Sequence, residues 1–139
     1  MITSEYKIRT RYSEVDQMGY VYHANYVTYC HQARTELMRT LGIHDKALGE
    51  KGIILPVIEM HLRYLKPAFY DEELTVVSTV SEIPKTRIII NFEFFNPAGE
   101  KICKARTAMA IVNEQSRKPM RAPQFIQEAF AEERIKSPV

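Results

Sequence analysis

A single long helical pattern, at residues 24–41, precedes a run of β-strand patterns that fills nearly all of the chain after residue 56. Apolar and small side chains recur there at steps of three and four residues, at Tyr26, Cys30, Ala33, Leu37 and Leu41. Gly42 follows the last of them, and glycine commonly ends helices in the left-handed conformation. One helix must therefore cover a whole sheet, and this requirement restricts the possible folds more than any other feature.

The strand patterns occupy five segments joined by short turns. Each segment alternates apolar and polar residues or is rich in β-branched and aromatic residues, and together they cover residues 6–12, 57–65, 73–82, 87–95 and 101–113. Strands that follow one another through short connections pair antiparallel. The sequence thus predicts an α+β fold, in which a five-stranded antiparallel sheet wraps around the long central helix. A short helix is expected over about residues 124–134.

The strand at residues 87–95 also suggests that the chain does not act alone. Its apolar side chains lie on one face of the strand, at Ile88, Ile90, Phe92 and Phe94. We expect Phe92 and Phe94 to lie on or near a sheet face that the helix does not cover. An uncovered apolar face favours the pairing of two chains, so the sequence predicts a homo-oligomer.

Composition limits the class of protein. The 139 residues suggest a single domain spanning 1–139, and the net charge of +2 gives no indication of a nucleic-acid partner. Cys30 and Cys103 form no CxxC pair and are typical of buried thiols in a reduced compartment. The sequence shows neither a signal-peptide core nor an apolar run long enough to cross a bilayer, and it contains no metal-binding His or Cys spacing. We therefore expect a soluble cytoplasmic protein that uses no metal.

Asp16 lies in a short loop between the first strand and the long helix. The backbone N–H groups at a helix amino end lack partners within the helix and can polarise a carbonyl oxygen. A carboxylate beside that carbonyl can attack it or activate a water molecule. The same loop also allows a plain turn or capping role for Asp16. His23 offers either its ring or its backbone N–H at the helix start, and Tyr12 is either a packed strand aromatic or a group that holds Asp16.

This segment resembles the hotdog-fold thioesterases, and most closely the 4-hydroxybenzoyl-CoA thioesterase family and its bacterial acyl-CoA thioesterase branch. The resemblance is carried by Tyr12, Asp16, Gly19, the run Val21-Tyr22-His23, Asn25-Tyr26 and Ala33-Arg34, and further on by Tyr64 and Lys66-Pro67-Ala68. It implies a hotdog fold, a homodimer or homotetramer, and an active site between two subunits. It also implies hydrolysis of an acyl-CoA thioester, with Asp16, His23 and Tyr12 as catalytic residues. Many relatives carry an acidic residue where this chain has His31.

The same resemblance indicates how the substrate is held. Tyr22, Ala24 and Asn25 are expected to contact it near the helix start, and Lys85, Arg87 and Lys118 are expected to meet the phosphates of coenzyme A. The reaction needs no redox cofactor. Other possibilities are an acyl carrier protein thioesterase, an enoyl-thioester hydratase and a non-catalytic acyl-CoA binding module. The presence of Asp16 argues against the binding module, because binding alone does not require a carboxylate at the thioester.

Overall fold

The computed structural model describes the backbone of residues 1–136 and the side chains of residues 1–131. Its helices are α1 (Asn25–Thr40), α2 (Asp45–Glu50) and α3 (Gln124–Lys136), with a 3-10 turn η1 (Tyr12–Glu14) before α1. The strands are β1 (Ile2–Arg9), β2 (Ile53–Ile54), β3 (Val57–Tyr64), β4 (Glu73–Val80), β5 (Arg87–Phe95), β6 (Lys101–Ala110) and β7 (Val112–Asn113). No helix in this described part is long and apolar enough to span a membrane.

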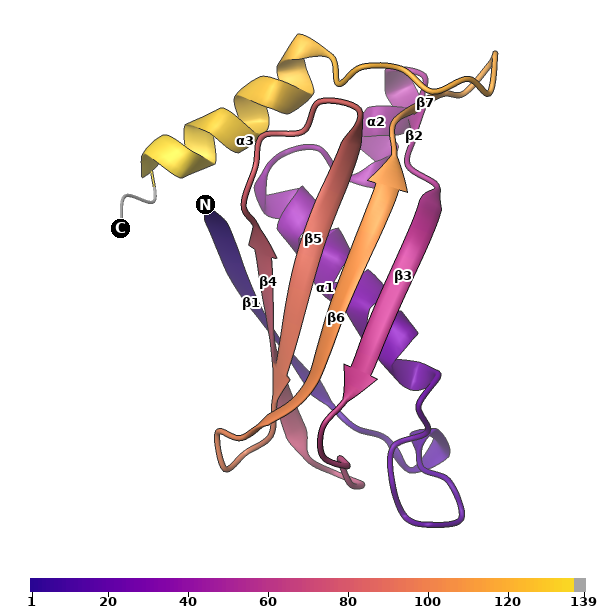
Figure 1. Cartoon of the computed structure of the whole chain (residues 1–139), viewed down its shortest axis with the longest axis vertical. Helices are drawn as coiled ribbons and strands as arrows, with labels where there is room; N and C mark the ends of the chain where they lie inside the picture. Colours follow the sequence, from indigo (N-terminus) through magenta and orange to yellow (C-terminus); the bar gives the residue numbers. More distant parts are fainter. Residues whose placement is uncertain (137–139) are drawn as a thin grey trace.

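Five of the strands form one antiparallel sheet in the order β1-β4-β5-β6-β3, and α1 crosses one face of it (Figure 1). The expected five-stranded sheet on a long helix is therefore confirmed. The expected end of that helix is also confirmed, because Gly42 has φ +76° and the N–H of Ile43 donates to the carbonyl of Met38 at 3.0 Å. β1 and β3 form the two edges of the sheet.

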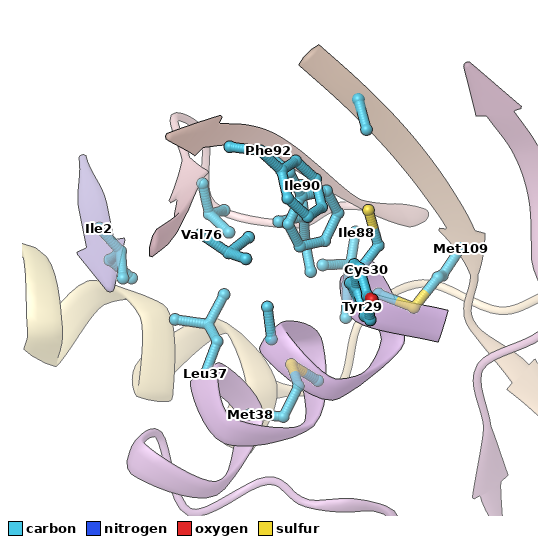
Figure 2. Close-up of a cluster of buried hydrophobic side chains, with 14 of the residues drawn as sticks. Ile2, Tyr29, Cys30, Leu37, Met38, Val76, Ile88, Ile90, Phe92 and Met109 are labelled. Carbon is cyan, nitrogen blue, oxygen red and sulfur yellow. The ribbon is translucent and has the colours of Figure 1, made fainter. Parts of the chain in front are cut away.

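The core lies between α1 and the inner face of the sheet (Figure 2). Ile88, Ile90, Phe92 and Phe94 of β5 are all at most 1% exposed and pack on the helix side. The expectation that Phe92 and Phe94 lie on an uncovered face is therefore wrong. Strand alternation puts all four side chains on the face that α1 covers, and the helix is long enough to bury them.

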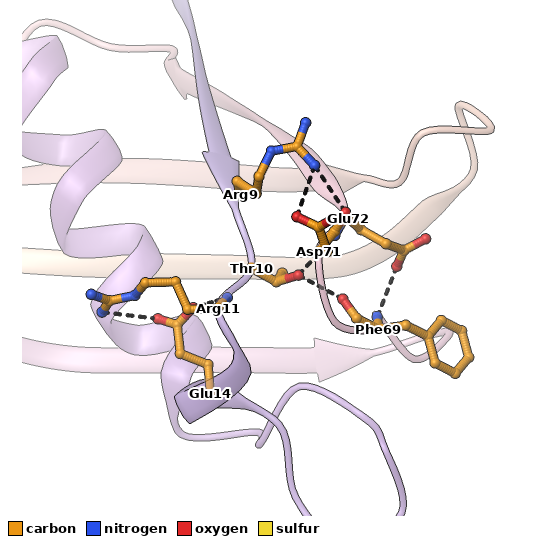
Figure 3. Close-up of polar contacts among 7 residues, drawn as sticks. All are labelled: Arg9, Thr10, Arg11, Glu14, Phe69, Asp71 and Glu72. Carbon is orange, nitrogen blue, oxygen red and sulfur yellow. Dashed lines mark hydrogen bonds and ion pairs between the residues drawn. The ribbon is translucent and has the colours of Figure 1, made fainter.

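The first strand ends earlier than expected, at Arg9 instead of Tyr12. The reason is Thr10, whose hydroxyl donates to the carbonyl of Phe69 at 2.6 Å and accepts the N–H of Glu72 at 2.9 Å (Figure 3). These bonds fasten the end of β1 to the loop before β4. The chain then turns into η1, because the Glu14 carboxylate accepts the N–H of Arg11 at 2.8 Å.

The last long strand is also interrupted. β6 ends at Ala110, and β7 leaves the main sheet to pair with β2. The break occurs at Ile111, which is fully buried and whose N–H donates to Thr86 outside the ladder. The expected helix at the end of the chain is confirmed as α3, and its Ile126 and Phe130 are fully buried.

Candidate active site

The loop around Asp16 is closed by its own backbone. The N–H of Asp16 donates to the carbonyl of Tyr20 at 2.8 Å, and Gly19 donates back to the carbonyl of Asp16 at 2.9 Å. Gly19 has φ +81°, a conformation that side chains rarely adopt. The Oδ1 atom of Asp16 accepts the N–H groups of Met18 at 2.9 Å and Tyr20 at 3.3 Å. The Oδ2 atom accepts no hydrogen bond from any residue that the structure describes, so one carboxylate oxygen stays free.

Glu14 fastens this loop to the start of α1. The residue is 7% exposed, and its side chain accepts hydrogen bonds from the N–H of Arg11 at 2.8 Å and the hydroxyl of Tyr29 at 3.0 Å. Its backbone carbonyl accepts the Nδ2 group of Asn25 and the N–H of Tyr22, both at 2.8 Å. Glu14 thus fixes the position of the helix start relative to Asp16 through both its side chain and its backbone carbonyl.

The helix start presents free donors. Ala24 caps α1 with no side-chain hydrogen bond, and neither its N–H nor that of His23 donates to another residue in the described part of the chain. The hydroxyl of Tyr64 donates to the carbonyl of His23 at 2.9 Å, which holds the peptide in place. Two adjacent N–H groups at a fixed helix amino end are suited to bind an oxyanion.

Asp16 and the helix start share one cavity of about 290 Å³, which we call the Asp16 cavity. Its lining is mostly apolar and consists of Asp16, Met18, Tyr20, Val21, His23, Tyr26, Tyr64, Leu65, Lys66 and Pro67. The Lys66 ammonium is held in an ion pair with Glu100. Asp16 and His23 therefore border the same space, which has few other polar groups and in which electrostatic interactions are stronger than in bulk water.

The expected site residues near the helix start do not all line this cavity. Asp16 and His23 line it, and Ala24 caps the helix beside it. The side-chain amide of Asn25 instead donates a hydrogen bond to the carbonyl of Glu14. Tyr22 is 48% exposed, and its ring packs against the ring of His23 with centroids 4.5 Å apart.

Tyr12 lies outside the Asp16 cavity. It is 77% exposed and packs edge to face on Tyr70, with ring centroids 5.6 Å apart. Its hydroxyl makes no hydrogen bond to Asp16. His31 is exposed and lines a separate pocket of about 160 Å³ farther along α1, with Cys30, Arg34 and Met60 among its neighbours.

The three expected phosphate-binding cations lie at the other end of the sheet. Lys85 and Arg87 line a cavity of about 390 Å³ at the start of β5, and the carbonyl of Lys85 accepts the N–H of Ala122 from the segment that contains Lys118. In Figure 1 this end is at the top and the loop of Asp16 is at the lower right. β5 spans about 30 Å between the two ends, at ~3.3 Å per residue.

Glu14 is the residue that the sequence reading missed. A capping box is normally recognised in a sequence by Ser or Thr three residues before Glu, but here Arg11 occupies that position. The Arg11–Glu14 spacing of three was the available signal. The resemblance includes Tyr64 but gives it no role at the helix start, because its bond to His23 is a contact between distant segments that no local pattern predicts.

Comparison with known proteins finds similarity to thioesterases over most of the chain. Residues 10–130 match the thioesterase-like superfamily. YneP of Bacillus subtilis (strain 168), named as a candidate acyl-CoA thioesterase, is 35% identical over 120 residues, which are 86% of this chain and 87% of YneP. The acyl-CoA thioester hydrolase YbgC of Escherichia coli O6:H1 is 27% identical and aligns over 88% of this chain and 92% of its own length.

The same likeness extends to solved structures. The crystal structure of a DHNA-CoA thioesterase from Staphylococcus aureus superposes with a TM-score of 0.88 and 32% identity, over 95% of this chain and 91% of that one. The expected hotdog fold is confirmed by this superposition and by the family match. The family match is broader than the 4-hydroxybenzoyl-CoA thioesterase family that the sequence resembles. On these findings the chain belongs to the thioesterase-like superfamily of hotdog-fold proteins.

Proposed function

We propose that this chain hydrolyses acyl-CoA thioesters to a carboxylic acid and free coenzyme A. The observation that carries the proposal is the Asp16 cavity, which Asp16 and His23 both line at the amino end of α1, where the N–H groups of His23 and Ala24 have no partner in the described part of the chain. The names of YneP, YbgC and the DHNA-CoA thioesterase support the choice of coenzyme A thioesters.

In the proposed reaction the thioester carbonyl oxygen accepts hydrogen bonds from the N–H groups of His23 and Ala24. These donors stabilise the negative charge that develops on that oxygen as the carbonyl carbon is attacked. The C–S bond then breaks, coenzyme A leaves as a thiolate that takes up a proton, and the acyl group leaves as a carboxylate. The sum of the steps consumes one water molecule.

Asp16 supplies the attack by one of two routes. Its Oδ2 atom attacks the carbonyl carbon and forms a mixed anhydride that water then opens, or it takes a proton from a water molecule that attacks instead. Both routes use the same oxygen and the same cavity. The ring of His23 is available to return a proton to the leaving thiolate, although a thiolate leaves readily without it.

The coenzyme A phosphates require a second copy of the chain in this proposal. Lys85, Arg87 and Lys118 lie at the end of the sheet opposite Asp16, so they do not serve the Asp16 cavity of their own chain. β3 is an edge strand of the described sheet, and its Val57 and Ile58 are half exposed. Such an edge readily pairs with another strand.

Antiparallel pairing of two β3 strands reverses the partner end for end. The end of the partner's sheet that carries these cations then lies beside the Asp16 cavity. Across the proposed interface, the partner's β5 is three strands away from the β3 of the first chain, which is about 14 Å at ~4.8 Å per strand. We therefore propose a dimer through β3, as a minimum assembly, whose active sites each use both chains.

We also propose that the protein is cytoplasmic. Cys30 and Cys103 are buried and unpaired with each other, which fits a compartment that keeps thiols reduced. Fractionation of the producing cells tests this localisation, and recovery of the protein outside the cytoplasm would contradict it.

The decisive test of the function is a hydrolysis screen. The full chain is incubated with a panel of acyl-CoAs of different length and aromaticity, and release of free thiol is measured. We expect hydrolysis of at least one compact acyl-CoA well above the rate without protein. The same acyl groups attached to acyl carrier protein are tested for comparison. If the acyl group is released faster from the carrier protein than from coenzyme A, the carrier protein is the leaving group instead of coenzyme A. Tight binding of acyl-CoA without any thiol release would instead make the chain a binding module.

A further inference from the structure

Tyr26 is a buried residue whose hydroxyl has no hydrogen-bond partner in the described part of the chain. The residue is 2% exposed, and its ring meets those of Tyr29, Tyr64 and Phe94 edge to face, with centroids 5.8, 5.2 and 5.3 Å away. Its Oη atom makes no hydrogen bond with any residue in the described part of the chain. Buried tyrosine hydroxyls nearly always have a partner.

The neighbouring tyrosines show that this is specific to Tyr26. The hydroxyl of Tyr29 donates to Glu14 at 3.0 Å, and the hydroxyl of Tyr64 donates to the carbonyl of His23 at 2.9 Å. Both rings belong to the same aromatic cluster as Tyr26. The cluster thus satisfies two hydroxyls within the protein and leaves the third available.

The free hydroxyl opens into the Asp16 cavity. Among the described residues, Ser78 Oγ is the side-chain oxygen that is both fully enclosed and unpartnered, so the Tyr26 hydroxyl keeps some access to space outside the protein atoms. The opening that Tyr26 lines is the Asp16 cavity. Its ring packs on Phe94, which is fully buried, so it lies on the interior side of the cavity, where the acyl group of a bound thioester would enter.

The hydroxyl is a donor at every working pH. Burial raises the pKa of Tyr26 far above its usual value, so the proton stays on the oxygen at neutral and moderately alkaline pH. The cavity around it is small. A space of about 150 Å³ holds one benzene ring, so the ~290 Å³ of the Asp16 cavity accommodates a thioester and a compact acyl group.

We propose that Tyr26 is a specificity-determining residue whose hydroxyl donates a hydrogen bond to an oxygen carried by the acyl group, so that the preferred substrates are compact hydroxyacyl or oxoacyl thioesters. This inference rests on the proposed thioesterase function. A site that contains an unpaired buried donor discriminates against analogues that lack the matching acceptor, because the donor then loses its bond to water without gaining another.

The test compares matched substrates that differ by one oxygen. The pairs are butanoyl-CoA with 3-hydroxybutanoyl-CoA and with 3-oxobutanoyl-CoA, and benzoyl-CoA with each of its three monohydroxy isomers. We expect kcat/KM of the parent protein to be about tenfold higher for at least one oxygenated member than for its unsubstituted partner, as one hydrogen bond allows. In Tyr26→Phe this ratio should fall to about one, through loss of activity on the oxygenated member alone.

Tyr29→Phe is the matched control, because it removes a hydroxyl from the same aromatic cluster but from outside the cavity. It should lower stability and leave the substrate ratio of the parent unchanged. A substrate ratio in folded Tyr26→Phe equal to that of the parent would overturn the inference. A ratio near one for every substrate pair in the parent would also overturn it, and this measurement tests the inference even if Tyr26→Phe does not fold. In both cases hydrolysis by the parent leaves the proposed function intact. Failure of the parent to hydrolyse any member would overturn the proposed function and this inference with it.

Discussion

The loop uses one of the two carboxylate oxygens of Asp16, a residue that also lines the cavity. Oδ1 holds the turn by accepting two backbone N–H groups, while Oδ2 accepts none from the residues that the structure describes. A turn role and a catalytic role were alternatives when only the sequence was considered, but the geometry makes them compatible. Substitution of Asp16 by a residue that keeps an oxygen at the Oδ1 position but not at the Oδ2 position separates the turn role from the catalytic role experimentally.

The two buried thiols give a prediction for alkaline pH. Burial raises the pKa of Cys103 from 9.0 to about 12 and also raises that of Cys30. The folded state holds these protons more tightly than the unfolded chain does. Their contribution to stability is therefore complete below about pH 9 and is lost as the pH rises toward 12. We expect the thermal unfolding temperature to fall over this range, and to fall less steeply in Cys103→Ala. Equal slopes for the parent and the variant would contradict this account.

At the scale of elements, the start of α1 depends on contacts from outside the helix. Asn25 ties it to η1, and Tyr64 ties it to the end of β3. The helix has no side-chain cap of its own, so these contacts set the direction of the free N–H groups.

Asn25→Ala tests this dependence. The change removes the hydrogen bond to the Glu14 carbonyl, so we expect the free energy of unfolding to fall by about 1–2 kcal/mol. We also expect kcat to fall more than KM rises, because the oxyanion donors are displaced. Thr28→Ala, at an exposed position of the same helix, is the control and should alter neither quantity. If the two variants behave alike in denaturant titration and kinetics, the anchoring role is wrong.

The elements that the sequence predicted well are those decided by local pattern. The period of the long helix, Gly42 after it, and the alternation from Ile88 to Phe94 all depend on residues close together in the chain. The errors arise from distant contacts. β1 ends early because Thr10 bonds to Phe69 and Glu72, about sixty residues away, and no local pattern records that.

The candidate site shows the same division. Asp16 and His23 are brought together because one short loop joins them. Charge and resemblance predict that the site includes Lys85, Arg87 and Lys118. Their distance from Asp16 depends on the direction of β5 in the sheet, which local sequence patterns do not predict.

At the scale of the whole molecule, the open edge of β3 predicts an assembly. Light scattering should give a mass of at least twice the 16.2 kDa of one chain. Ile58→Lys places a charge on this edge and should produce smaller, inactive particles. Thr3→Lys makes the same kind of change on β1, the opposite edge, and should leave the mass unchanged. A parent mass of 16.2 kDa across micromolar concentrations would rule out the dimer.

The same assembly predicts the effect of the distant cations. Arg87→Ala and Lys118→Ala should raise KM for acyl-CoA by about tenfold, the cost of one charge-assisted hydrogen bond, with kcat nearly unchanged. Lys7→Ala on β1 is the control and should leave KM as it is. If KM is equally unchanged in the Arg87 and Lys118 variants, neither residue contacts the substrate.

The central claim is that the free oxygen of Asp16 drives hydrolysis, and kcat of Asp16→Asn measures it most directly. The asparagine keeps an oxygen for the N–H groups of Met18 and Tyr20, so the loop and the thermal stability should be preserved. Its amide neither attacks a thioester nor takes a proton from water, so kcat should fall at least about a hundredfold, a typical lower bound for general-base catalysis. A folded Asp16→Asn protein that hydrolyses its best acyl-CoA at the parental rate would contradict the account.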